Sequence, residues 1–298
     1  MTMNQNLFNL GSAVGALVFL ASAPFGVQAQ TKPLRALLIT GGCCHDYAVQ
    51  KDLLKAGIEA RANVVVDLLH SDDKSTKPPL AIYGKPDYAK GYDVVIHDEC
   101  AAAISDPEVI KGVLAPHRAG IPGVNIHCAV HCYRIGSPAQ PAEPGSERAL
   151  WFDYLGLQSS GHGPQLPIPA TTLNEKHPIT AKLDWRNWTT IKEELYNNVQ
   201  VLKSATPLHH GTQELKQKDG TVKKAEAVVT WVNDYQGTRV FNTTLGHFSE
   251  TVADARYLDL VTRGLLWACG KLDDSYLKPG PHPSLPVPGA PAQKTKTP

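Results

Sequence analysis

The sequence predicts an α/β protein built on a mainly parallel, doubly wound sheet. Short aliphatic segments alternate with longer segments of helical periodicity, and over the first half of the chain they follow the order β-α-β-β-α-β. The short segments are apolar over most of their length, which is typical of parallel strands covered by helices on both faces. Together these two observations indicate an open sheet enclosed by helices.

The first half of the chain supplies four strands and two helices. The segment 35–40 is a β-branched and aliphatic run, so a strand is expected there. Leu53, Leu54 and Ile58 recur at helical spacing, which predicts a helix over 47–61. The other elements of this half are a strand at 63–69, a strand at 93–97 after a Pro-rich connection, a helix from Ser105-Asp106-Pro107-Glu108 to about Arg118, and a strand at 121–126.

The second half is less regular. A short helix is expected at 151–157, between Pro- and Gly-rich loops at 137–146 and 159–164. The polar stretch 213–224, with Asp219-Gly220, predicts a hairpin or an exposed insertion. Strands are expected at 168–173, 199–203, 227–232 and 239–245, and an amphipathic helix that closes the sheet at 254–269.

The chain divides into a leader (1–29), a core domain (30–276) and a flexible Pro-rich tail (277–298). The leader has no charged side chain, and its apolar stretch ends before Val27-Gln28-Ala29, a small-x-small pattern suited to signal peptidase. We therefore expect export to the periplasm or the extracellular space. Because the first residues offer only the terminal amine as positive charge, an uncleaved membrane anchor is the alternative.

Composition narrows the set of partners. The formal net charge is +1 and the basic residues are scattered, so the sequence predicts neither nucleic-acid binding nor stable membrane insertion once the leader is cleaved. The oligomeric state is not indicated. Of the 6 cysteines, five lie at predicted strand ends that should be close in space, and one disulfide among them is expected: Cys43, Cys44, Cys100, Cys128 and Cys132.

Histidines gather just past the predicted strands. Five of the 12 lie there, and the densest group is the turn His127-Cys128-Ala129-Val130-His131-Cys132 after the strand at 121–126; the others are His45, His97 and His247. An open α/β sheet binds its ligands outside the carboxyl ends of its strands. Any single histidine could be an ordinary hydrogen-bonded loop residue, but the recurrence predicts a common site.

Several sequence blocks resemble the ThuA-like (trehalose utilisation) family. The similarity covers about 35–272, and the blocks occur in the right order: His177-Pro178-Ile179-Thr180, Lys192-Glu193-Glu194-Leu195-Tyr196, Trp231-Val232, 237–247 and Gly264-Leu265-Leu266-Trp267-Ala268. The resemblance implies a flavodoxin-like variant of the class I glutamine amidotransferase-like fold and a role in disaccharide or keto-sugar metabolism. It also implies that His127, and not a thiol, is the functional group of its turn, and it favours Glu194 over Glu193 as a site residue.

The turn departs from the amidotransferase pattern. Those relatives present a nucleophilic cysteine between two glycines, whereas here Cys128 has no glycine on either side and Val130 is β-branched. A Cys128-dependent, amidase-like hydrolase remains an alternative, since an imidazolium neighbour lowers the pKa of a thiol.

Imidazoles beside carboxylates can bind a metal or transfer protons near neutral pH. For a divalent metal such as zinc, the expected ligands are His127, His131 and His247, completed by an acid of the Glu193-Glu194 pair. For metal-free chemistry, His127 would be the base, with Glu194 or Asp46 as the orienting acid. Substrate binding is expected from side chains in loops or at element ends: His45, Tyr133, His162, Tyr196 and Asn197.

The sequence thus predicts an exported ThuA-like protein, more consistent with an enzyme than with a binding module, that acts on a small sugar or keto-glycoside. Hydrolase, lyase and isomerase chemistry all remain open. A non-catalytic carbohydrate-binding protein is the rival interpretation.

Overall fold

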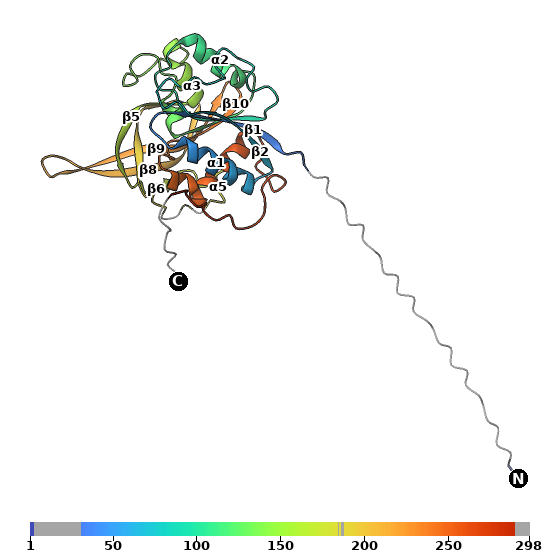
Figure 1. The fold of residues 1–298 in the computed structure, drawn as a ribbon. Helices are drawn as coiled ribbons and strands as arrows, with labels where there is room; N and C mark the ends of the chain where they lie inside the picture. The colour runs from blue at the N-terminus through green and yellow to red at the C-terminus, as the bar shows by residue number, and fades with distance from the viewer. Residues whose placement is uncertain (3–30, 184, 186–187, 290–298) are drawn as a thin grey trace. The chain divides into compact units, whose positions relative to one another are not determined.

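The computed structural model describes residues 1–2, 31–183, 185 and 188–289 (Figure 1). The predicted signal peptide at 1–29 therefore lies outside the described residues, apart from Met1 and Thr2. Among the helices that are described, none combines the length and the apolar character needed to cross a membrane.

A large mixed sheet organises the domain. Its eight strands follow the order β2-β1-β3-β4-β10-β9-β8-β6. The first five strands in this order are parallel to one another, and the last three are antiparallel. The parallel strands are β2 (Val64–Ser71), β1 (Leu34–Gly42), β3 (Val94–Cys100), β4 (Gly123–Ile126) and β10 (Thr238–Thr243); the antiparallel ones are β9 (Val222–Tyr235), β8 (Ala205–Lys216) and β6 (Ala170–Thr172). The parallel half has the flavodoxin-like strand order, which confirms the predicted fold class.

Helices cover both faces of the parallel half. On one face lie α1 (Tyr47–Arg61), α4 (Ser249–Ala253) and α5 (Ala255–Ala268); on the other lie α2 (Pro107–Arg118) and α3 (Leu150–Leu155) (Figure 1). Strand β1 serves both layers because its side chains alternate: Leu38 packs in the core with α1 and α5, and Ile39 in the core with α2 and α3. Two short 3₁₀ helices, η1 (His127–His131) and η2 (Glu147–Ala149), follow β4 and precede α3.

The second half departs from the sequence prediction at one segment that matters for the site. The expected loop at 159–164 belongs to strand β5 (Leu157–Leu166), which pairs with β7 (Glu193–Val201) in a separate antiparallel sheet. Gly, Ser and Pro in this segment are typical of a loop, but pairing with a distant strand overrides that local preference. The polar hairpin is confirmed: β8 and β9 are joined by a turn that contains Asp219 and Gly220.

The described part of the predicted tail lies against the helices. Leu277 bridges to Ala62, the amide of Lys278 donates to Arg61 O at 2.8 Å, and the amide of Leu285 donates to Ala253 O at 2.9 Å. Leu285 and Val287 also pack on the core. This segment brings residues 287–289 to the rim of the cleft described below.

Candidate functional site

An open cleft of ≈ 770 Å³ lies at the carboxyl ends of β1, β2 and β10. Its walls come from the loops that follow these strands, which is where an open α/β sheet places its ligands. Gly42 has φ +101°, and a Cβ there would lie 2.4 Å from Cys100 O, so only glycine allows the chain to leave β1 this close to β3.

His127 stands at the end of β4 in a strained conformation. Its φ is +44°, in the left-handed region that non-glycine residues rarely occupy. Its Nδ1 lies 2.6 Å from Thr244 O, so Nδ1 carries the proton and donates it, while Nε2 is left with a free lone pair. Strain of this kind is typical of functional residues. The residue that the turn presents is therefore His127, and not Cys128.

His45 and His247 join His127 from the ends of β1 and β10. The ring centroid of His45 lies 4.6 Å from that of His127 and 4.7 Å from that of His247. His127 Nε2 and His247 Nδ1 are 3.2 Å apart. The three histidines each offer a ring nitrogen, and these atoms all lie within 4.8 Å of one another. We refer to His45, His127 and His247 as the histidine trio.

Glu194 is the carboxylate of the histidine trio. Its Oε2 lies 3.4 Å from His247 Nδ1 and 3.7 Å from His127 Nε2, and Gln165 Nε2 donates to its Oε1 at 3.1 Å. Burial by itself would raise the pKa of Glu194, but the hydrogen bonds from His247 and Gln165 outweigh burial and lower it. Glu194 is therefore ionised at neutral pH.

Glu193 points to the other side of β7 and has a different role. It is fully buried, and both of its carboxylate oxygens lie 3.1 Å from the amide nitrogen of His247. Burial raises its pKa to about 7 despite hydrogen bonds that favour the anion. Glu193 thus holds the loop that carries His247. Strand periodicity places the two adjacent acids on opposite faces, which is the signal that could have separated their roles.

Burial keeps two members of the histidine trio, His45 and His127, neutral. Desolvation, followed by repulsion from His247, lowers the pKa of His45 to about 4. Desolvation, followed by repulsion from His45, lowers the pKa of His127 well below its usual value. At pH 7 both rings therefore have lone pairs available for a metal or a proton, and His127 cannot act as the imidazolium that would activate Cys128.

His131 belongs to a neighbouring group and not to the histidine trio. Its ring stacks on Tyr196 with centroids 3.9 Å apart, and its Nε2 lies 2.8 Å from Ser159 Oγ. Since that hydroxyl donates to Gly161 O, Nε2 of His131 donates to Ser159. The trio that the structure assembles thus contains His45, which the sequence assigned to substrate binding, in the place expected for His131.

The remaining predicted site residues lie at different distances from the trio. Tyr196 is buried, and its hydroxyl lies 3.4 Å from His127 Nε2. His162 is exposed on β5, with Nε2 3.6 Å from Glu194 Oε2. Asp46 lines the cleft at the start of α1. Tyr133 is buried, and its hydroxyl donates to Glu99 Oε1 at 2.7 Å, away from the cleft.

Asn197 is exposed, but it follows Tyr196 on β7 and so faces the opposite side of the strand. Sequence reasoning did not identify Gln165, whose Nε2 lies 2.9 Å from His247 Nε2, or Phe248, which lines the cleft beside His247. The sequence does not point to Gln165, because β5 has the composition of a loop.

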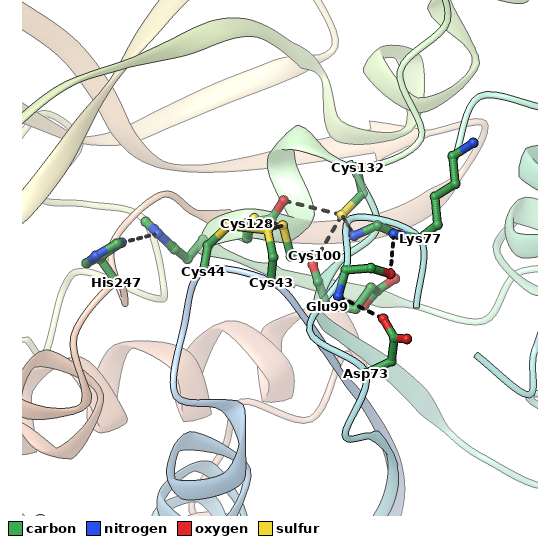
Figure 2. Close-up of a disulfide and its surroundings, with 12 residues drawn as sticks. Cys43, Cys44, Asp73, Lys77, Glu99, Cys100, Cys128, Cys132 and His247 are labelled. Atoms are coloured by element: carbon green, nitrogen blue, oxygen red, sulfur yellow. Dashed lines mark hydrogen bonds between the residues drawn. A yellow bond between two sulfur atoms is a disulfide. The ribbon is translucent and has the colours of Figure 1, made fainter. Parts of the chain in front are cut away.

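The strand-end cysteines meet beside the trio, and one disulfide forms among them, as expected. Cys43 and Cys44 are bonded, and Cys128 Sγ lies 2.6 Å from Cys100 Sγ (Figure 2). The hydrogen bond with Cys100, and then burial, raise the pKa of Cys128 well above its usual value. A buried, protonated thiol that faces another sulfur gives no support to Cys128 as the nucleophile towards a substrate.

The chain matches a known family, and solved structures share its fold. The family model for trehalose utilisation (ThuA) matches residues 35–268. A putative ThuA-like protein from Parabacteroides merdae ATCC 43184 is 21% identical with a TM-score of 0.59, over 80% of this chain and 91% of that one. A putative ThuA-like protein from Bacteroides uniformis ATCC 8492 is 15% identical with a TM-score of 0.51, over 80% and 93% of the two chains. At these identities the likeness carries the fold alone. No curated protein sequence matches the chain.

Proposed function

The chain belongs to the ThuA (trehalose utilisation) family, and from the site inside the matched region we propose that it is an exported enzyme that acts on a small sugar or keto-glycoside. Its chemistry is metal-assisted and centred on the histidine trio, with Glu194 as the acid-base group.

The spacing of the ligand atoms is the observation that carries this proposal. Two ligands about 2.0–2.1 Å from one tetrahedral metal lie about 3.3–3.4 Å from each other. His127 Nε2 and His247 Nδ1 are 3.2 Å apart, and Glu194 Oε2 is 3.4 Å from His247 Nδ1. The two imidazole nitrogens thus have the separation of two ligands around a zinc-sized ion, and Glu194 Oε2, 3.4 and 3.7 Å from them, lies close enough to act as the acid-base group beside it.

Protonation and burial fit the same ion. The Thr244 carbonyl accepts the Nδ1 proton of His127, an arrangement that fixes the tautomer and aims the other ring nitrogen at a metal. His45 Nδ1 is buried without a hydrogen-bond partner among the described residues. A bound ion would satisfy an orphaned atom of this kind. Three histidines are also the protein ligands of one type of catalytic zinc site.

A divalent metal held there would polarise a carbonyl or lower the pKa of a bound water molecule. Glu194, which is buried and ionised, can take a proton from a substrate hydroxyl or from water beside the trio. Tyr196 supplies a hydroxyl 3.4 Å from His127 Nε2 that can donate to a developing oxyanion.

The cleft suits a polar ligand of sugar size. Its volume of ≈ 770 Å³ lies within the usual range for small-molecule sites. Phe248 offers an aromatic face, and hydrogen-bonding side chains for hydroxyl groups line the rest of the wall: Asp46, His70, Asp72, Asp73, Lys74 and Glu250.

A metal-free version of the same function has its own support. Gln165 Nε2 lies 2.9 Å from His247 Nε2, so an amide donor there would place the His247 proton on Nδ1, which faces His127 Nε2 and Glu194. His247, His127 and Glu194 would then form a proton-transfer chain. Metal analysis separates the two versions.

Export is proposed from the apolar, uncharged segment at the N-terminus. The disulfide between Cys43 and Cys44 supports this proposal, because disulfides persist mainly in oxidising compartments.

The test combines metal content with turnover. Purified protein, stripped with a chelator and reloaded with zinc, should bind about one equivalent and should turn over members of a panel of disaccharides and 3-keto-glycosides. Asn197→Ala is the matched control, since Asn197 lies on the same strand but faces away. Turnover without bound metal that zinc does not increase supports the acid-base version. Sugar binding without turnover in either state would replace the enzyme by a binding protein.

A further inference from the structure

Four cysteine sulfurs form an unbroken series of contacts beside the histidine trio. Cys44 is bonded to Cys43, Cys43 Sγ lies 3.5 Å from Cys100 Sγ, and Cys100 Sγ lies 2.6 Å from Cys128 Sγ. Figure 2 shows these sulfur atoms side by side, contributed by the loop after β1 and by the ends of β3 and β4. We refer to Cys44, Cys43, Cys100 and Cys128 as the sulfur chain.

We propose that the sulfur chain is a thiol–disulfide exchange site, in which the disulfide moves from Cys43–Cys44 to Cys100–Cys128 and frees a thiol at Cys44 in the cleft. The external reactants of this site are small thiols and disulfides. The proposal rests on the sulfur positions and is independent of the sugar chemistry proposed above.

The exchange takes two steps and needs no oxidant or reductant. In the first, the Cys100 thiolate attacks Cys43 Sγ; the Cys43–Cys44 bond breaks, and Cys44 leaves as a thiolate. In the second, the Cys44 thiolate released in the first step takes the proton of Cys128, and Cys128 Sγ attacks Cys100 Sγ; the Cys43–Cys100 bond breaks, and Cys43 leaves as a thiolate. Cys100 and Cys128 each lose a proton, and Cys43 and Cys44 each gain one, so atoms and electrons balance.

The positions suit this direction of attack. The sulfur nearest to Cys100 is that of Cys43, so the leaving group is Cys44, which is exposed on the cleft wall. The distance of 2.6 Å between Cys100 Sγ and Cys128 Sγ exceeds the ~2.05 Å of a disulfide bond by about half an ångström, so a small movement of the two side chains would bring the sulfurs to bonding distance. In addition, the hydrogen bond from Cys128 lowers the pKa of Cys100, which favours the attacking thiolate.

The other two cysteines are placed outside the series. Cys132 Sγ accepts from the amide of Ala101 at 2.9 Å and donates to Glu99 O at 3.1 Å. Cys269 lies just after α5, where it packs against the core and its Sγ lies 3.9 Å from the Asp93 carbonyl oxygen. Cys269 therefore provides the matched control.

The exchange would affect the histidine trio through the polypeptide backbone. Cys128 directly follows His127, so a Cys100–Cys128 bond would tie the strained turn at His127 to the end of β3. The position of the disulfide is in this way linked to the conformation of His127.

Maleimide labelling of the native protein, purified without reductant, tests the proposal. Exchange exposes Cys44, and labelling then traps it, so wild-type protein should gain label at Cys43 and Cys44 while peptide mapping finds a Cys100–Cys128 disulfide. Cys128→Ala should stop after the first step, with label at Cys44 and a Cys43–Cys100 linkage. Cys100→Ser should remain unlabelled at Cys43 and Cys44, and Cys269→Ser should behave like wild type.

Two results would overturn the proposal. One is wild-type protein that keeps the Cys43–Cys44 disulfide and gains no label over hours, although circular dichroism shows it to be folded. The other is label at Cys44 that accumulates equally fast in Cys100→Ser. Because no sugar or metal enters the experiment, neither result bears on the proposed enzyme.

Discussion

Both carboxylate oxygens of Glu193 lie 3.1 Å from the amide nitrogen of His247, so a fully buried acid on β7 holds the backbone of a site histidine in the loop that follows β10 of the other sheet. The adjacent Glu194 faces the imidazoles instead. Of these two adjacent acids, Glu193 therefore supports the backbone of the site, and Glu194 carries its negative charge.

Glu193 should make stability depend on pH. The carboxyl ionises near its ordinary pKa of 4.5 in the unfolded chain and at about 7 in the folded protein. Between these values only the folded state holds the proton, so the free energy of unfolding falls as pH rises from about 4.5 to about 7, by about 3 kcal/mol, and then levels off. Urea unfolding at pH 5 and pH 8 should show this loss in wild type and its absence in Glu193→Gln.

Glu214→Gln, an exposed carboxyl on β8, is the control for that measurement and should leave the loss unchanged. Equal losses in wild type and Glu193→Gln would show that Glu193 is not protonated in the folded protein.

The left-handed backbone at His127 predicts an unusual order of stability. A non-glycine residue at φ +44° costs about 1–2 kcal/mol, which glycine avoids. Since Ala and Gly both remove the imidazole, His127→Gly should be more stable than His127→Ala by about 1 kcal/mol in urea unfolding. Ala129→Gly, two residues on and without a positive φ, should instead lose stability. If glycine gave a more stable protein than alanine at both positions, the result would contradict a strained backbone at His127.

His45 and His131 should differ in their effect on metal binding. His45 is a member of the trio, whereas Nε2 of His131 is occupied by Ser159. His45→Ala should lower zinc affinity more than the about 10–100-fold that loss of a supporting residue costs. His131→Ala should change it by less than about threefold, because it removes no ligand. Isothermal titration with zinc measures both variants, and a larger loss in His131→Ala would restore the ligand set expected from sequence.

Close packing of α1 on α5 can be tested at Gly57. A Cβ there would lie 2.4 Å from Leu258 Cδ2, and because the Leu258 side chain is fully buried, it can move aside only by disturbing its packed neighbours. Gly57→Ala should therefore cost about 1–3 kcal/mol of unfolding free energy. Gly112→Ala on α2, where a Cβ meets nothing within 4 Å, should gain up to about 1 kcal/mol from helix propensity. Thermal unfolding distinguishes the two; equal shifts would contradict the close contact.

Sequence reasoning anticipated that strand-end histidines would meet, because parallel strands end at the same edge of a sheet. His45, His127 and His247 each follow a strand of the parallel half, and all three converge. It could not choose between His45 and His131, because that choice depends on the direction in which each turn aims its ring. The turn after β4 sends His127 to the trio and His131 to Tyr196, and the φ of His127 decides this.

The sequence pattern does not predict the sheet that β5 and β7 form. Gln165 and His162 lie on a strand with the Gly and Pro content of a loop, and β7 was expected to begin only at 199. Had the strand been extended back to Glu193, its alternation would have separated Glu194 and Tyr196 from Asn197. Tyr133 looked available in a turn, but its hydroxyl is taken up by the buried Glu99.

By itself, then, the sequence determined the α/β class, the family and the edge of the sheet where the polar side chains gather. The hydrophobic periodicity, the sequence blocks of the family and the order of elements along the chain are all local properties. Only the tertiary structure decided which side chains share the cleft, which of the two acids holds the His247 loop and which faces the imidazoles, and which sulfurs touch. These depend on backbone angles at single turns and on contacts between segments more than 100 residues apart, such as His127 and Thr244 with a separation of 117. The local sequence pattern predicts neither these angles nor these contacts.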